Sequence, residues 1–168
     1  QAIYQDPHWK EGGYTAEAAP SHGLSLARQI GMMTYRSPEN YEAKFGRDIR
    51  EITNHPYYQV ESYLDYQGQK LNKRFDALSY ERLTRSMDTH DISRDRGCFK
   101  EVAKQLTIPI HVVGILSDAL YPISEQKDLG QLLPNGQFTA LDSPYGHDAF
   151  LIEFDQLTHI LSRFLATT

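Results

Sequence analysis

The sequence predicts an α/β protein with a mostly helical first half and a second half that runs strand, helix, strand, helix. Over residues 1–106, apolar residues recur every three or four positions, which is typical of helices with one apolar face. Beyond that point, short β-branched runs alternate with helical patterns, which favours parallel strands joined by crossover helices. We therefore expect a helical region at 1–106 and an α/β region at 107–168.

The helical spacing of the first half is clear in three apolar stripes. They consist of Leu24, Ala27, Ile30 and Met33; of Val60, Tyr63, Leu64, Leu71 and Phe75; and of Tyr80, Leu83 and Met87. Pro38 marks the start of a further helix after the first stripe. The polar segment "GRDIREITNHPYY" at 46–58 is expected to be a connection.

The second half begins with "IPIHVVGILSD", a short β-branched run that predicts a strand buried on both faces. A helix is expected over "PISEQKDLGQLLPN", a second strand over "GQFTALDS" and a long amphipathic helix over "DAFLIEFDQLTHILSRFL". Two strands cannot make a stable doubly covered sheet alone. We expect the remaining strands to come from residues before position 1 or from another chain.

Composition excludes several classes of protein. The chain has 168 residues, 40% of them hydrophobic, which is enough for one domain with a core. Its charges are mixed, with a formal net charge of -5. It has no basic run, so nucleic acid is not an expected partner. Its longest apolar stretches are too short to span a membrane. With Cys98 as the single cysteine, no disulfide forms within the chain, which favours a reducing, cytoplasmic compartment.

The first residues, "QAIYQDPHWKEGGY", contain neither an initiator methionine nor a charged-then-apolar signal. They resemble the middle of a structure rather than its beginning. We therefore expect this chain to be a fragment, or one piece of a longer protein.

Asp118 and His147 follow the two predicted strands, 29 residues apart. Because reactive groups collect beyond the carboxyl ends of parallel strands, one strand–helix–strand crossover can bring these side chains together. A buried aspartate next to a histidine fixes the imidazole tautomer and stabilises the imidazolium during catalysis. The alternatives are that Asp118 only caps the next helix and that His147 is structural.

The nucleophile that such a pair would activate is absent from the chain. No G-x-S-x-G pattern occurs, and Ser37, Ser62, Ser117 and Ser143 lack the strand–turn–helix setting of a nucleophile elbow. In a hydrolase-type chain order of Ser, Asp and His, the serine would precede residue 1.

Two other candidate sites are interpreted as structural. Cys98 lies in the polar turn "RDRGCFKE" and is not expected to act as a nucleophile. Asp88, His90 and Asp91 in "DTHDIS" fit no strong zinc spacing, so we expect capping and hydrogen bonding there and no metal site.

The sequence resembles the C-terminal half of the homoserine O-acetyltransferases, acyltransferases of the α/β-hydrolase fold that act in methionine biosynthesis. The matching stretches are "GLSLARQIGMMTYRS", "VESYLDYQGQKLNKRFDALSYERLTRSMDTHDIS", "SDALYP" and "YGHDAFLIE". They span nearly the whole chain in the family's order. The resemblance implies that the first half is a helical lid and that the second half is the end of the core sheet.

The resemblance also implies roles. A serine takes acetyl from acetyl-CoA, a co-substrate, and homoserine then attacks the acyl-enzyme; no other cofactor is implied. His147 would be the general base and acid, and Asp118 would orient it. Arg28 would bind the substrate carboxylate, Tyr35 would lie near the acceptor, and Asp148 would bind its amino group. The nucleophilic serine would come from the N-terminal half of the same protein.

Each implied binding role has an alternative in the sequence itself. Arg28 could be a solvated helix charge, and the nearby Arg36 could be the carboxylate clamp instead. Asp148 could be only an acidic residue favoured by a helix N-terminus, and Tyr35 could be a core residue.

Other functions remain open at this point. Serine could replace homoserine as acceptor, succinyl-CoA could replace acetyl-CoA as donor, or water could make the protein an esterase. A different class is a non-catalytic interaction module whose apolar helix faces form a dimer interface. The resemblance implies a homodimer formed through the lid helices.

Overall fold

The computed structural model describes residues 1–167 and divides into two compact units. The first contains Gln1–Met33 and Glu42–His90, and the second contains Thr34–Tyr41 and the chain from Asp91 onward. The segment 34–41, called the elbow segment below, thus groups with the α/β part although it lies in the helical half of the sequence. The sequence boundary near 106 remains a prediction about domains of the longer protein.

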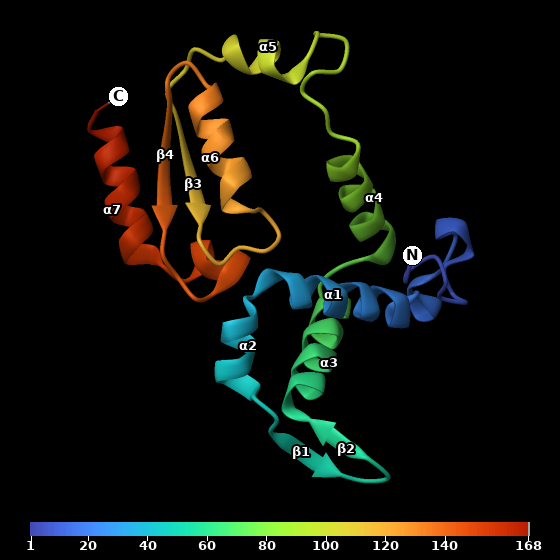
Figure 1. Ribbon diagram of the computed structural model, residues 1–168. Helices are drawn as coiled ribbons and strands as arrows, with labels where there is room; N and C mark the ends of the chain where they lie inside the picture. Colours follow the sequence, from blue (N-terminus) through green and yellow to red (C-terminus); the bar gives the residue numbers. More distant parts are fainter. Residues whose placement is uncertain (168) are drawn as a thin grey trace. The chain divides into compact units, whose positions relative to one another are not determined.

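The expected helices of the first half are present (Figure 1). The elements are η1 (Lys10–Gly12), η2 (Ala16–Ala18), α1 (Ser21–Tyr35), α2 (Pro38–Phe45), β1 (Ile49–Ile52), β2 (Pro56–Tyr58), α3 (Gln59–Asn72) and α4 (Ala77–Asp88). The expected plain connection at 46–58 was wrong, because β1 and β2 form an antiparallel hairpin there. Its isoleucines and tyrosines favour strands, and its tip, with Asn54, favours a turn.

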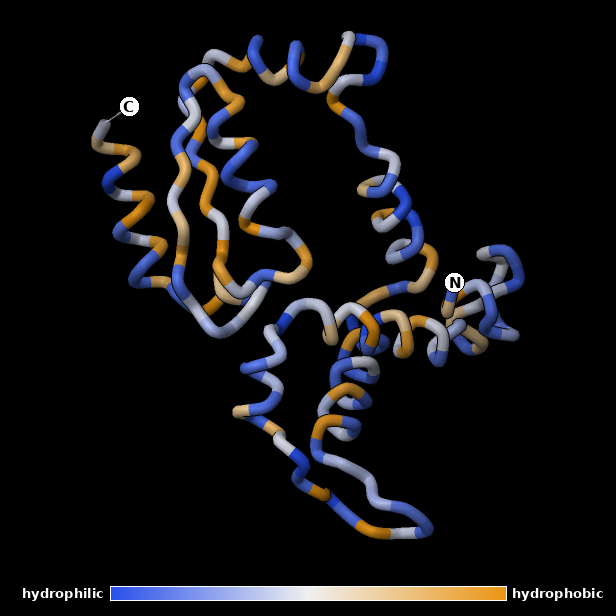
Figure 2. Tube along the Cα trace, viewed as in Figure 1, coloured by the Kyte–Doolittle hydropathy of each residue, from blue (hydrophilic) through white to orange (hydrophobic). Residues whose placement is uncertain are grey.

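The core of the first unit joins α1, α3 and α4 to the N-terminal segment. Its buried members are Ile3, Leu24, Leu71 and Ala77. Trp9, Tyr14, Ala27, Phe75 and Tyr80 pack against them. Part of each apolar stripe therefore supplies this core, whereas other stripe residues, such as Met33 and Met87, are exposed. Figure 2 shows the alternation of apolar and polar residues along the helices.

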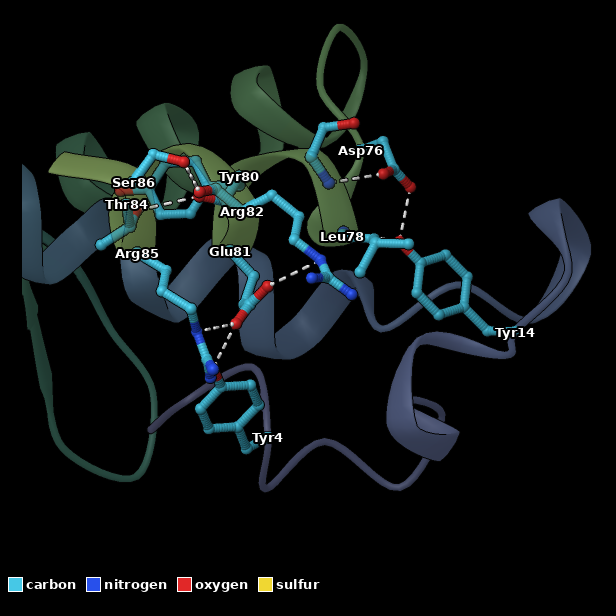
Figure 3. Close-up of polar contacts among 11 residues, drawn as sticks. Tyr4, Tyr14, Asp76, Leu78, Tyr80, Glu81, Arg82, Thr84, Arg85 and Ser86 are labelled. Atoms are coloured by element: carbon cyan, nitrogen blue, oxygen red, sulfur yellow. Dashed lines mark hydrogen bonds and ion pairs between the residues drawn. The ribbon is translucent and has the colours of Figure 1, made fainter. Parts of the chain in front are cut away.

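Two tyrosines fasten the N-terminal segment to α4 (Figure 3). The Tyr4 hydroxyl donates to Glu81 Oε1 at 2.6 Å and accepts from Arg85 Nη2 at 2.9 Å. The Tyr14 hydroxyl donates to Asp76 Oδ1 at 2.5 Å and accepts from the Leu78 amide at 2.7 Å. Because Asp76 is also the N-cap of α4, the helix start and the N-terminal segment share one polar network.

The second unit is a parallel α/β unit, as predicted. Its elements are α5 (Phe99–Lys104), β3 (Ile110–Ile115), α6 (Ile123–Leu132), β4 (Gly136–Leu141), η3 (Gly146–Leu151) and α7 (Phe154–Leu165). β3 pairs with β4 in parallel, from Ile110 opposite Gly136 to Ile115 opposite Leu141. The expected single helix from Asp148 onward is wrong, because Ile152 and Glu153 leave the helical conformation and separate η3 from α7.

The two strands are covered on both faces, with α6 and α7 on opposite sides (Figure 1). Towards α6, the buried residues are Ala103, Val112 and Leu133. Towards α7, Ile115, Leu141 and Ala149 are buried, and Leu157 and Ile160 of α7 pack against them. This alternation follows from the two-residue period of strands. Across the described residues 1–167, no helix has both the length and the apolar character to cross a bilayer.

The buried carboxylate of Asp6 should make the stability of the protein depend on pH. It accepts hydrogen bonds from the Gly23 amide at 2.7 Å, in the first turn of α1, and from the His8 amide at 2.9 Å. Burial raises the pKa of Asp6, but these hydrogen bonds outweigh burial and hold the pKa below its usual range. The stabilisation is therefore present at neutral pH and is lost as the pH falls through that lowered pKa.

We expect Asp6→Asn to lower the free energy of unfolding of the intact protein by about 1–3 kcal/mol at neutral pH, because one amide oxygen replaces two acceptors. The loss should shrink at acidic pH, as the pH falls through the lowered pKa of Asp6 and the wild-type carboxylate is itself protonated. Urea denaturation across pH measures it, with Asp128→Asn on exposed α6 surface as control. An equal loss at both pH values would contradict the assignment.

Candidate active site

Asp118 lies directly beyond β3 and is 9% exposed. Its Oδ1 accepts hydrogen bonds from the amides of Leu120 at 2.8 Å and Tyr121 at 3.0 Å, which lie in the following turn. Its Oδ2 lies 2.9 Å from Nδ1 of His147. The turn therefore orients the carboxylate so that its second oxygen faces the imidazole.

His147 lies in η3, beyond β4, on a loop tied to the β3 end. Ser117 Oγ donates to the Ser143 carbonyl at 2.6 Å and accepts from the Gly146 amide at 2.9 Å. Because a carboxylate only accepts, Asp118 assigns the proton to His147 Nδ1 and leaves Nε2 as the basic nitrogen. An imidazole in this tautomer can take a proton from a hydroxyl at Nε2 and return it.

Three aromatic rings surround the His147 imidazole. Tyr35 at the end of α1, Tyr121 after β3 and Phe150 in η3 have ring centroids 5.8, 5.2 and 5.4 Å from it. These rings cover part of the His147 side chain, which is 24% exposed, and restrict its orientation. Such an environment strengthens the hydrogen bond between His147 and Asp118 relative to one in water.

The elbow segment packs directly beneath the His147 loop. Ser37, 1% exposed, donates from Oγ to the Pro144 carbonyl at 2.6 Å and accepts from the Asn40 amide at 3.0 Å, so it also caps α2. Gly146 has φ +65°, and a Cβ there would lie 2.6 Å from the Ser37 nitrogen. Glycine is therefore required twice, by its backbone conformation and by the close approach.

Arg36 of the elbow segment forms an ion pair with Asp148, the residue after His147. Arg36 Nε lies 3.5 Å from Asp148 Oδ2, and both side chains are 19% exposed. Arg36 Nη1 also donates to Asn40 Oδ1 at 3.0 Å. The pair places one positive and one negative group beside the histidine.

The second unit brings together four of the residues singled out in the sequence, Asp118, His147, Tyr35 and Asp148. Arg28 is half-buried in the part of α1 that belongs to the first unit, so its role remains a prediction. The functional roles of the other four also remain predictions.

Sequence reasoning missed several residues around His147. Tyr121 and Phe150 carried no signal beyond their place in the quoted motifs, and Ser37 and Ser117 were considered only as nucleophiles. Gly146 was visible next to His147, but its requirement depends on the elbow segment, which is distant in the sequence.

In the segment "DTHDIS", Asp91 Oδ1 accepts from the Ser93 amide at 2.8 Å and its hydroxyl at 2.6 Å, as expected for hydrogen bonding there. Among residues 1–167 there is no group of three or more His, Cys, Asp and Glu side chains placed to hold a metal ion.

The sequence of the chain is similar to those of known enzymes over nearly its whole length. Homoserine O-acetyltransferases of Chlorobium chlorochromatii and Salinibacter ruber are 48% identical over 165 residues and 46% identical over 166 residues. The alignments cover 98% and 99% of this chain, but 46% and 47% of those proteins. The chain is homologous to the homoserine O-acetyltransferases. It spans about half the length of the curated relatives it matches, and no protein-family model matches it.

Solved structures agree with this homology. A homoserine O-acetyltransferase from Bacillus anthracis superimposes with a TM-score of 0.87 at 23% identity, covering 98% of this chain and 46% of that one. The homoserine O-acetyltransferase from Staphylococcus aureus gives a TM-score of 0.68 at 30% identity, with 98% and 44% covered. Esterase E22 gives 0.85 at 16% identity, with 98% and 47% covered. The architecture is therefore part of an α/β-hydrolase fold, as predicted.

The close approach at Gly146 can be tested against a second glycine of positive φ. Gly46 has φ +48°, but a Cβ there would meet its nearest neighbour, the Glu42 carbonyl, at 3.7 Å. Gly46→Ala should therefore cost only the backbone term of about 1–2 kcal/mol in the free energy of unfolding. Gly146→Ala should cost at least about 1 kcal/mol more, because the elbow segment must move. Urea denaturation measures both, and equal losses would contradict the close approach.

Proposed function

We propose that the protein containing this chain is a homoserine O-acetyltransferase. It transfers the acetyl group of acetyl-CoA to the hydroxyl of L-homoserine and yields O-acetyl-L-homoserine, a step of methionine biosynthesis. The observation that carries the proposal is the contact of 2.9 Å between His147 and Asp118 in a chain 48% identical to such enzymes. The remaining half of the protein would supply the serine nucleophile.

In the first step, His147 Nε2 takes the proton of the serine hydroxyl while the oxygen attacks the thioester carbonyl of acetyl-CoA. The C–S bond then breaks, and the CoA thiolate leaves with the proton that His147 returns. In the second step, His147 takes the homoserine hydroxyl proton as that oxygen attacks the acetyl-serine. The serine oxygen leaves and regains the proton. Asp118 keeps Nδ1 protonated and stabilises the imidazolium in both steps.

Acceptor recognition would come from the residues around His147. Asp148 would bind the ammonium group of homoserine, and Tyr35 would lie beside the acceptor. Arg28 would bind the carboxylate, because a guanidinium can grip a carboxylate with two hydrogen bonds. The chemistry needs neither a metal nor a cofactor beyond acetyl-CoA as co-substrate.

The related reactions differ only in donor or acceptor. A serine acceptor or a succinyl donor would use the same histidine and aspartate, and so would an esterase that accepts water. The likeness to esterase E22, at 16% identity, supports the fold alone. The closer relatives favour transfer to homoserine.

The first half would be a lid that also pairs two subunits. Exposed apolar residues support this part of the proposal: Ile30 and Met33 on α1 are 54% and 61% exposed, and Leu83 and Met87 on α4 are 56% and 69% exposed. A cytoplasmic location is also part of the proposal, because an exposed free thiol at Cys98 suits a reducing compartment.

Substitution of the proposed base and its partner tests the mechanism. In the full-length protein, we expect His147→Ala to lower kcat/KM for acetyl transfer by at least about 1,000-fold, and Asp118→Asn by about 1,000-fold or more, because the imidazole loses its tautomer. His159→Ala, an exposed histidine on α7, is the matched control and should keep wild-type activity. Near-normal transfer by the His147 variant would contradict the mechanism.

The subunit pairing has its own test. Met33→Glu combined with Met87→Glu should convert a dimer to a monomer in light scattering, because two charges would be buried in an apolar contact. The control Lys127→Glu lies on the exposed surface of α6 and should leave the mass unchanged. A full-length wild-type protein that is monomeric at micromolar concentration would overturn this part of the proposal.

A further inference from the structure

The ion pair between Arg36 and Asp148 has no part in the catalytic steps described above, yet it lies next to the base. The two side chains are 19% exposed, and Arg36 Nε lies 3.5 Å from Asp148 Oδ2. Asn40 accepts from Arg36 Nη1 at 3.0 Å and so fixes the direction of the guanidinium. Asn40 is in turn held at the start of α2, where its amide donates to Ser37 Oγ. The guanidinium is therefore positioned by two residues of the elbow segment.

The backbone supports the same arrangement. The chain at Arg36 and Ser37 approaches Gly146 so closely that a Cβ on Gly146 would lie 2.8 Å from the Arg36 carbonyl carbon. Arg36 thus faces the loop that carries His147 and Asp148 at short range. A partly buried arginine in this position interacts with a carboxylate more strongly than a solvated one, because less water screens the two charges.

The charges around His147 make a partner for Asp148 necessary. Asp118 already occupies Nδ1 of the imidazole at 2.9 Å. A second carboxylate, one residue from the histidine and without a cation, would be costly to keep half-buried and would turn towards water or compete for the imidazole. Arg36 offsets that cost and keeps the Asp148 carboxylate in one orientation.

We propose that Arg36 is a positioning residue that holds the Asp148 carboxylate in place to receive the ammonium group of the acceptor. This inference rests on the proposed function, in which Asp148 binds that group. Arg36 acts through Asp148 and touches neither the donor nor the reacting atoms. The acetylation of the serine, which involves no amino group, does not depend on it.

The proposal predicts that loss of Arg36 affects the transfer of acetyl to homoserine but not the acetylation of the serine. In the full-length protein, Arg36→Gln should raise the KM for homoserine about tenfold, the size expected from loss of a coupling of this kind. The rate of the acyl-enzyme burst with p-nitrophenyl acetate should stay within about twofold of wild type, since that step has no ammonium group to bind. The burst and the steady-state rates with acetyl-CoA and homoserine give both numbers.

A substrate comparison gives an independent readout. The acceptor 4-hydroxybutanoate has the hydroxyl and carboxylate of homoserine but no amino group. Wild-type protein should prefer homoserine strongly, because the site must leave Asp148 without its ammonium partner when the analogue binds. Arg36→Gln should reduce this preference about tenfold, whereas a general loss of structure would lower both rates alike.

A double-mutant cycle tests whether Arg36 acts through Asp148. If it does, Arg36→Gln combined with Asp148→Asn should be no worse in kcat/KM for homoserine than Asp148→Asn alone. If Arg36 instead binds the substrate carboxylate directly, the two losses multiply, and the proposal is overturned. An unchanged KM in Arg36→Gln, or a burst that falls as much as the steady-state rate, overturns it as well.

Two milder variants keep the test decisive if Arg36→Gln does not fold. Arg36→Lys keeps the charge but loses the fixed fork that reaches Asn40, and Asn40→Ala releases the guanidinium from its second contact. Both should raise the KM for homoserine by about two- to fivefold with a normal burst. Absence of acetyl transfer by the wild-type protein would instead contradict the proposed function, so the two failures are distinguishable.

Discussion

The candidate site depends on the parallel pairing of β3 with β4. Parallel strands bring their carboxyl ends to the same edge of a sheet, so the turns after Ile115 and Leu141 begin side by side. Asp118 follows one strand and His147 the other, and their side chains meet at 2.9 Å. An antiparallel or shifted pairing would separate the two residues, however favourable their chemistry.

Strand ends alone do not orient an imidazole, and the loops supply the remaining constraints. Ser117 ties the two turns together, and Ser37 holds the Pro144 carbonyl from the elbow segment. Gly146 has no Cβ and therefore leaves room for that segment. These contacts are short and partly buried, so the His147 loop is held by backbone and side-chain hydrogen bonds.

The two acidic residues near His147 have different partners. Asp118 contacts the imidazole, and Asp148 forms an ion pair with Arg36. Each carboxylate therefore has a partner, which makes it possible to keep both close to one histidine. The elbow segment contributes both the packing beneath the loop and the cation.

The sequence by itself determined the α/β class, most of the helices and both strands of the parallel pair, because hydrophobic period is a local property. It also predicted that Asp118 and His147 could meet, but the contact itself depends on the pairing of the strands. It did not reveal the hairpin at 46–58 or the break between η3 and α7. At both places the local preference for one backbone conformation is weak, and packing decides which one forms. Only the tertiary structure brought Arg36 and Ser37 to Asp148 and Gly146. These contacts join residues more than a hundred positions apart along the chain, and no local pattern encodes such an approach.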